Sequence, residues 1–352
     1  MISLRVPGRI CFYGDHQDYL DMPVIAGAIN RYLFLEAKPH QDKSFMLELE
    51  DLQEERCIGL PVGDSEIQKG DFYLSAIRIL EQNGFEFNQG YLVRIRSDIP
   101  MNAGLSSSSA LVVAWVRFLV ATQKNRVVSD AQIGHWAYQA EVPFFGFPGG
   151  LMDQYTIAQQ GLLFIDTKAQ TTRALPARFE AFVVAESGLP KQTNTILKNA
   201  RNYQELAIAQ VREVHPEFDL SHSVPEDAES YLPLVDEEYK RHWIAAVKNY
   251  HITLAAQEQL EKELPNHHQL GELMNAHQDL LENNIQNTPE AMRVMMAAAR
   301  NAGAYGAKIV GSGGGGSMVA LVPPKQKEEV AKAFLKAGAQ AAYVVELSYP
   351  EV

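Results

Sequence analysis

The chain has 352 residues, of which 46% are hydrophobic and 21% charged, so it is long enough for two domains and too apolar for extended disorder. Its formal net charge is −12 and no Lys/Arg-rich run occurs, which argues against nucleic acid or an anionic membrane as a partner. With only two cysteines and no signal-peptide pattern at its start, we expect a cytoplasmic protein.

Apolar and polar residues alternate at three places in the first hundred residues, which predicts half-buried strands at 2–6, 45–49 and 91–95. Two helices are predicted next, over 106–121 and 129–141. The first contains the longest apolar stretch, which Arg117 interrupts and which falls far short of the roughly 20 residues that cross a bilayer. Ser129 and Gln132 have the spacing of a capping box at the start of the second helix.

The second half of the chain mixes strands and helices. Strands are predicted at 162–165 and 182–185, followed by about a hundred residues of helical pattern from about residue 190. Further strands are predicted at 307–310, 318–322 and 343–347, with a helix at 325–337 that Gly338 ends. This pattern predicts an α+β chain of two domains, residues 1–185 and 186–352.

A Gly-rich turn follows the helix at 129–141 and has a carboxylate on each side. Glu141 ends the helix, Gly149 and Gly150 form the turn, and Asp153 comes directly after it. Two carboxylates across a turn that lets the backbone approach a ligand suit a metal-assisted reaction on a small polar substrate. Taken alone, the segment is equally compatible with a helix-terminal Glu and a capping Asp.

A Gly/Ser loop at 100–109 leads directly into the apolar helix. Such a loop offers unpaired amides, hydroxyl donors and the positive end of the helix dipole, which together suit a polyphosphate. A Ser hydroxyl at this place can also bind Mg²⁺. A simple helix cap needs one Ser, whereas Ser106 to Ser109 supply four, so phosphate binding is favoured.

A second glycine loop occupies residues 311–317 and formally contains the pattern G-x-G-x-x-G. A dinucleotide fingerprint must open a helix, whereas a strand is predicted directly after this loop. The glycines extend over more residues than a turn between strands requires. Close approach of the backbone to a ligand is therefore the favoured interpretation.

Polar side chains are concentrated between residues 9 and 19, behind the first predicted strand. They include Arg9, Asp15, His16, Asp18 and Tyr19. A cluster this rich in hydrogen-bonding groups suits a ligand with many hydroxyls, such as a sugar. A solvated hairpin tip is the alternative that this segment leaves open.

Together, these loops resemble the GHMP small-molecule kinases, named for galactokinase, homoserine kinase, mevalonate kinase and phosphomevalonate kinase. Segments 7–19, 100–108 and 140–154 are most similar to the galactokinase motifs, and mevalonate kinases normally lack an acid matching Asp18. Two features depart from galactokinases: Asp15 stands where they usually have Glu, and segment 308–317 is more similar to mevalonate and heptose kinases. The resemblance therefore points to a sugar-1-kinase.

The resemblance implies an N-terminal ribosomal-S5-like α/β domain and a C-terminal ferredoxin-like α+β domain, with the active site between them. It also implies transfer of the ATP γ-phosphoryl group to a monosaccharide hydroxyl, the anomeric one by likeness to galactokinase. Kinases of a uronic acid, arabinose, a heptose phosphate or mevalonate are alternatives, as is a galactokinase-like ligand sensor. The resemblance also implies a small-molecule sugar substrate and ATP as partners, and a chain that is a monomer or a homodimer.

Roles for individual residues also follow from the resemblance. Asp153 would face the attacking hydroxyl, as a general base or an electrostatic partner, and Arg9 would orient it. Ser108 and Glu141 would hold Mg²⁺. The residues implied to bind the sugar are Asp15, His16, Asp18 and Gly150. Those implied to bind the ATP phosphates are Gly104, Leu105, Ser106, Ser107, Ser108 and Ser109, with Gly313, Gly314 and Gly315 shaping the cleft from the other domain.

Overall fold

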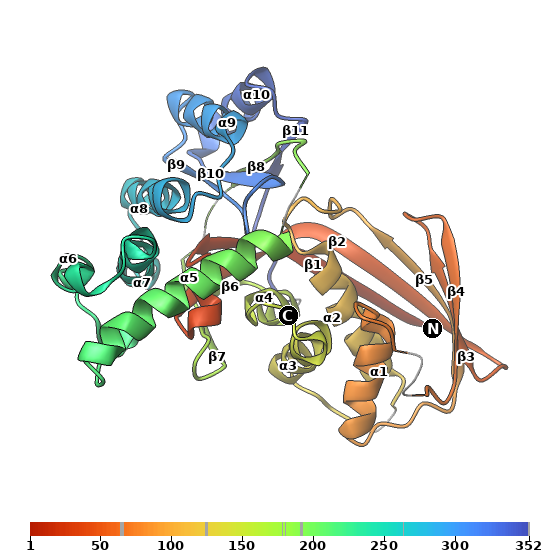
Figure 1. The fold of residues 1–352 in the computed structure, drawn as a ribbon. Helices are drawn as coiled ribbons and strands as arrows, with labels where there is room; N and C mark the ends of the chain where they lie inside the picture. Colours follow the sequence, from red (N-terminus) through yellow and green to blue (C-terminus); the bar gives the residue numbers. More distant parts are fainter. Residues whose placement is uncertain are drawn as a thin grey trace.

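The structure, a computed structural model, describes residues 1–63, 67–123, 126–177, 179, 181–190, 193–262 and 264–350, with the backbone alone at 193–195. Its strands form two sheets (Figure 1). The larger sheet contains β1 (Ile2–Tyr13), β2 (Val24–His40), β3 (Ser44–Leu49), β4 (Glu54–Gly59), β5 (Gly90–Ser97), β6 (Leu162–Asp166) and β7 (Thr171–Ala174). The smaller sheet contains β8 (Phe182–Glu186), β9 (Gly306–Ile309), β10 (Ser317–Leu321) and β11 (Ala341–Val345).

The larger sheet is built around β2, which pairs antiparallel with β1, β5 and β6. The order of the strands is β4-β3-β5-β2-β6-β7, with β1 also on β2. The β3–β5 pairing is parallel. The three predicted alternations lie within β1, β3 and β5, so those strands are confirmed.

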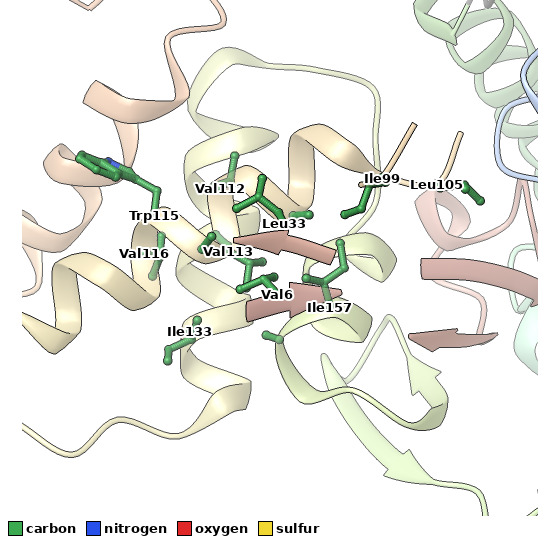
Figure 2. Packing of buried hydrophobic residues seen from close by; sticks show 14 of the residues in the cluster. Val6, Leu33, Ile99, Leu105, Val112, Val113, Trp115, Val116, Ile133 and Ile157 are labelled. Carbon is green, nitrogen blue, oxygen red and sulfur yellow. The ribbon is translucent and has the colours of Figure 1, made fainter. Parts of the chain in front are cut away.

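The first four helices lie against one face of the larger sheet (Figure 1). They are α1 (Phe72–Gln82), α2 (Ser107–Ala121), α3 (Asp130–Glu141) and α4 (Met152–Gln159). The helix α2 is apolar on most sides because it is packed between the sheet and α1, α3 and α4. Figure 2 shows its side chains, among them Val113, gathered with Val6 and Leu33 of the sheet. The Ser129 side chain accepts from the Gln132 amide at 3.2 Å, which confirms that Ser129 caps the helix as the predicted capping box requires.

The smaller sheet has the order β11-β8-β10-β9 and is antiparallel throughout. With α9 (Glu290–Asn301) and α10 (Lys327–Lys336) packed on it, the second unit has the βαββαβ order of a ferredoxin-like domain. The predicted α+β fold class is therefore confirmed. Residue 185, where the sequence analysis divides the domains, lies inside β8.

The remaining helices lie between β8 and α9 in sequence and are α5 (Thr193–Val214), α6 (Asp227–Ser230), α7 (Lys240–Leu260) and α8 (His267–Leu280). The long helix α5 packs against α7, and α7 packs against α8 (Figure 1). Among the residues that the structure describes, no helix has both the length and the apolar character needed to span a membrane.

The two sheets are joined by more than the chain that connects them. Leu347, just after β11, forms a bridge with Ile29 of β2, and the Asn30 amide donates to the Glu346 carbonyl at 3.0 Å. Phe12 of β1 and Phe182 of β8 pack with ring centroids 4.6 Å apart. One hydrophobic cluster therefore includes residues from both sheets.

Candidate active site

A cavity of about 380 Å³ lies where the loops singled out in the sequence meet. Its walls come from the turn after β1, the loop before α2, the end of α3, the start of α4, and the loop between β9 and β10. The predicted site residues that line it are Arg9, Asp15, His16, Asp18, Gly104, Ser106, Ser107, Ser108, Ser109, Glu141, Gly150 and Asp153. The structure thus gathers residues from distant parts of the chain; Arg9 and Asp153, for example, lie 144 positions apart.

Arg9 and Asp153 form a bidentate ion pair on one wall of the cavity. The Arg9 Nε and Nη2 atoms donate to the two carboxylate oxygens, each at 2.7 Å, and Nη1 donates to the Gly104 carbonyl at 2.6 Å. Ser106 also donates to the Asp153 carboxylate. Because a guanidinium fork holds a carboxylate in one plane, this contact fixes the direction in which Asp153 faces the cavity.

Ser108 and Glu141 meet on the adjacent wall. The Ser108 hydroxyl donates to Glu141 Oε1 at 2.9 Å, and Gln154 Nε2 donates to Oε2 at 2.6 Å. Burial raises the pKa of the Glu141 carboxyl, and these hydrogen bonds oppose that rise in part. A cation placed beside this buried carboxylate would offset its desolvation, so the pair is suited to bind one.

The loop before α2 and the first turn of that helix line the cavity with Gly104 and Ser106 to Ser109. Ser106, with φ of 61°, is the N-cap residue of α2, and the first amides of a helix have no partner within it. Leu105 differs from its neighbours because its side chain is fully buried in the core, while its carbonyl accepts from the Arg9 amide at 3.2 Å. Any contribution of Leu105 to phosphate binding would therefore come from its backbone.

Asp18 begins a 3-10 turn, η1 (Asp18–Leu20), and lies directly against Gly150. A Cβ atom at position 150 would overlap the Asp18 carboxylate, which explains why glycine occupies this position. Burial, with the nearby charge of Asp153, raises the pKa of Asp18 to about 7. Asp18 is thus a cavity carboxylate that titrates near neutral pH.

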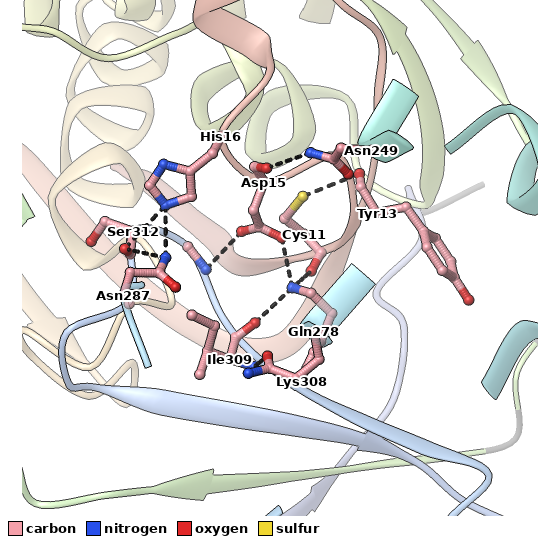
Figure 3. A network of polar contacts seen from close by, with 12 residues as sticks. Cys11, Tyr13, Asp15, His16, Asn249, Gln278, Asn287, Lys308, Ile309 and Ser312 are labelled. Carbon is pink, nitrogen blue, oxygen red and sulfur yellow. Dashed lines mark hydrogen bonds and ion pairs between the residues drawn. The ribbon is translucent and has the colours of Figure 1, made fainter. Parts of the chain in front are cut away.

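Asp15 and His16 line the cavity, and both also contact the segment formed by β9 and the loop that follows it (Figure 3). Asp15 accepts from Lys308 Nζ at 2.6 Å and from the Gly311 amide at 2.8 Å. The His16 ring lies 3.1 Å from the Ser312 carbonyl through Nε2 and 3.0 Å from the Tyr19 hydroxyl through Nδ1. Their assignment as sugar ligands stays a prediction.

The glycine loop contacts both the cavity and neighbouring backbone. Gly311 and Ser312 line the cavity, whereas added Cβ atoms at Gly313 and Gly315 would lie 2.6 Å from the carbonyl oxygens of Asn287 and Pro190, respectively. The glycines are thus needed where the loop packs on neighbouring backbone. Whether Gly313, Gly314 and Gly315 also approach the nucleotide stays a prediction.

Sequence reasoning missed two polar side chains that act on the predicted residues. Gln154 orients Glu141, and Lys308 is paired with Asp15. Both positions belong to the motif segments that carry the resemblance, but their partners lie elsewhere in the chain. The available signal for Lys308 was its place within the apolar strand predicted at 307–310, since a charge in a buried strand needs a partner.

Comparisons with known proteins match both halves of the chain to the models of one family. The family model for the GHMP kinases N terminal domain matches residues 71–161, and the model for the GHMP kinases C terminal matches residues 256–340. A galactokinase from Mannheimia succiniciproducens is 29% identical, over 94% of this chain and 88% of the relative. A mevalonate kinase from Thermococcus gammatolerans is 30% identical, over 96% of this chain and 93% of the relative.

Solved structures share the fold along the whole chain. The galactokinase of Lactococcus lactis, complexed with galactose, has a TM-score of 0.85 at 22% identity, covering 99% of this chain and 95% of that one. The mevalonate kinase of Methanococcus jannaschii has a TM-score of 0.74 at 19% identity, covering 99% and 98%. The chain belongs to the GHMP kinase family and is a phosphotransferase with an alcohol group as acceptor.

Proposed function

We propose that this kinase transfers the γ-phosphoryl group of ATP to a monosaccharide hydroxyl, and that the anomeric hydroxyl is the acceptor, as in a galactokinase. The observation that carries the proposal is the position of Asp18 against Gly150, in the same cavity as the Arg9–Asp153 pair. A carboxylate there can accept hydrogen bonds from neighbouring hydroxyls of a sugar. The 29% identical galactokinase supports the same substrate class.

In the proposed reaction, the acceptor oxygen forms a bond to the γ-phosphorus and the bond to the β,γ-bridging oxygen breaks, so that ADP leaves. Asp153 faces the acceptor hydroxyl and either takes its proton or holds it by charge. Arg9 keeps Asp153 oriented through its two 2.7 Å contacts and offsets negative charge that develops nearby. The start of α2 offers amides to the phosphates.

Mg²⁺ fits the pair formed by Ser108 and Glu141. Glu141 is a buried carboxylate that lines the cavity, and Ser108 adds a hydroxyl oxygen 2.9 Å away from it. Within the described part of the chain, no group of three or more His, Cys, Asp or Glu side chains is placed to hold a metal. Mg²⁺ suits such a sparse site because it takes few protein ligands beside phosphate oxygens and water, and it would neutralise phosphate charge there.

Glu141→Gln tests the cation site. The amide keeps the shape of the side chain but removes the charge, so the Mg²⁺ concentration for half-maximal activity is expected to rise on the order of tenfold. Sugar binding measured without metal should change little. Glu205→Gln, on the exposed side of α5, is the matched control. An unchanged Mg²⁺ requirement in Glu141→Gln would remove Glu141 from the cation site.

Asp18 makes sugar use depend on pH. If the ionised carboxylate binds the sugar and its pKa is about 7, kcat/KM for the sugar should fall about tenfold between pH 8 and pH 6. Asp18→Asn should abolish this dependence, whereas KM for ATP should follow the same pH profile in both proteins. In the sugar-free protein the raised pKa favours the protonated carboxyl, so its stabilising contribution is present below pH 4 and lost as pH rises through about 7.

A substrate screen tests the proposal as a whole. ADP release with Mg·ATP would be measured for galactose, arabinose, uronic acids, N-acetylhexosamines, heptose phosphates and mevalonate, and NMR of the product would locate the phosphoryl group. A neutral sugar phosphorylated at C1 is the expected result. Turnover of mevalonate alone, which the 30% identical relative makes a real alternative, would overturn the proposal. Sugar binding without ADP release would indicate a sensor.

A further inference from the structure

A buried ion pair connects the two sheets behind the cavity (Figure 3). Lys308, the third residue of β9, is fully buried, and its Nζ lies 2.6 Å from Asp15 Oδ2 in the turn after β1. The same ammonium donates to the carbonyls of Cys11 at 3.1 Å and Ile309 at 2.6 Å. All three donor hydrogens of Lys308 are therefore used within the protein.

The surroundings make Asp15 the charge partner of Lys308. Burial opposes ionisation of Asp15, but the charge and hydrogen bond of Lys308, together with smaller favourable interactions, lower the pKa of the carboxyl below its usual value. His277 of α8, which lies close to both, is neutral because burial and the Lys308 charge lower its pKa to about 3. Two charges are thus held out of water against each other, which makes the loss of either one costly.

Asp15 also holds the start of the glycine loop. Its second carboxylate oxygen, Oδ1, accepts from the Gly311 amide at 2.8 Å, and its carbonyl accepts from Asn249 of α7 at 2.8 Å. The next residue, His16, contacts the Ser312 carbonyl. We call the set Asp15, His16, Lys308, Gly311 and Ser312 the loop junction, since it joins the turn after β1 to the glycine loop.

The loop junction contrasts with Asp18, three residues further along. Asp18 lies against Gly150 and its carboxylate accepts only from the neighbouring Tyr19 amide, at 3.0 Å, among the described contacts. Both oxygens of Asp15 already accept hydrogen bonds, one from Lys308 of β9 and one from the Gly311 amide of the glycine loop. A sugar hydroxyl that donated to Asp15 would have to share these oxygens with the Lys308 ammonium and the Gly311 amide.

We propose that Asp15 and Lys308 are a positioning pair, and that they fix the glycine loop against the turn carrying Asp18 so that the sugar side and the phosphate side of the cavity keep one relative position. Asp15 acts through Gly311 and the loop, whereas Asp18 contacts the sugar. Only the kinetic consequences of this pair depend on the proposed sugar-kinase function. Its structural consequences can be measured without any substrate.

Hydrogen exchange followed by mass spectrometry tests the structural part. Asp15→Asn and Lys308→Met should each speed exchange in peptides covering residues 309–317, and Lys308→Arg should do so less than Lys308→Met because it keeps the charge. Asp18→Asn is the matched control and should leave these peptides unchanged. Equal exchange in the wild-type protein and Asp15→Asn, or in Lys308→Arg and Lys308→Met, would overturn the proposal.

The double variant Asp15→Asn/Lys308→Met keeps the test decisive if a single variant fails to fold. It removes both charges together, so no buried charge is left alone, and its melting temperature should be higher than that of either single variant. A melting temperature at or below the lower of the two single variants would mean that the residues act independently, which contradicts the pair.

Kinetics separate a positioning pair from a sugar ligand. Asp15→Asn should raise KM for ATP and for the best sugar of the screen together, each on the order of tenfold. A rise confined to the sugar, with unchanged exchange in the glycine loop, would make Asp15 a sugar ligand instead. If the screen finds no sugar substrate, the exchange and melting experiments still decide whether the pair exists, so the two proposals fail separately.

Discussion

Asp153→Asn is expected to lower kcat by about 10²–10⁴-fold on the best substrate, with the dissociation constants of sugar and ATP nearly unchanged. The substitution keeps the volume of the side chain but removes both its basicity and the negative charge that faces the acceptor hydroxyl. It also leaves the Arg9 guanidinium without the carboxylate to which two of its nitrogens donate hydrogen bonds at 2.7 Å. Single-turnover rates and equilibrium binding separate the loss in chemistry from any loss in binding.

Asp130→Asn is a suitable control for this substitution. Asp130 is a half-exposed carboxylate at the start of α3, paired with Arg117 at 2.8 Å, and it does not line the cavity. The control should retain kcat. Near-normal kcat in Asp153→Asn would make Asp153 a structural residue at the start of α4, and the proposed role of the Arg9–Asp153 pair would have to be withdrawn.

Gly150→Ala is expected to raise KM for the sugar on the order of 10²-fold, because displacement of a substrate-contacting group by about 1 Å can cost that much. A methyl group at position 150 would overlap the carboxylate of Asp18 and lie 2.9 Å from its Cβ. The Asp18 side chain must therefore move out of the position from which it faces the cavity. KM for ATP should change far less.

The adjacent glycine provides the matched control. An added Cβ at Gly149 would lie 3.6 Å from the Val142 side chain, which is an ordinary van der Waals contact. Gly149→Ala changes the same turn by the same methyl group and should leave the sugar KM within a few-fold of normal. Equal effects of the two substitutions would show that rigidity of the turn matters and that contact with Asp18 does not.

Local sequence signals predicted those helices and strands whose cap or apolar periodicity is visible in their own residues. The helix α3 begins where Ser129 caps it, and α2 follows the serine loop with Ser106 as its cap residue. The strand β2 was missed because its first six residues, from Val24 to Ile29, are all buried and show no alternation. The helix α1, which Asp71 caps, was also missed because it is a single 11-residue helix in a segment otherwise rich in strands.

In the site, too, residues within one segment were predicted, whereas contacts between segments were not. Nearly all residues that line the cavity lie within the motif segments 7–19, 100–109, 140–154 and 308–317. These segments were visible in the sequence because each keeps its polar and glycine residues within a few positions of one another. Contacts between segments could not be read from spacing: Lys308 and Asp15 lie 293 positions apart, and only the fold brings them together. For the same reason, the sequence could not distinguish Asp15, which contacts the glycine loop, from Asp18, which lies against Gly150.

The hydrophobic cluster that includes both sheets has a consequence for how the protein loses its structure. Phe182 and Val184 of β8 share this cluster with Ile10 and Phe12 of β1, and the backbone after β11 is bonded to β2. Neither sheet can melt without exposing apolar surface of the other. The unit with the larger sheet and the unit with the smaller sheet should therefore unfold in a single cooperative transition. A substitution that destabilises either unit should then destabilise both.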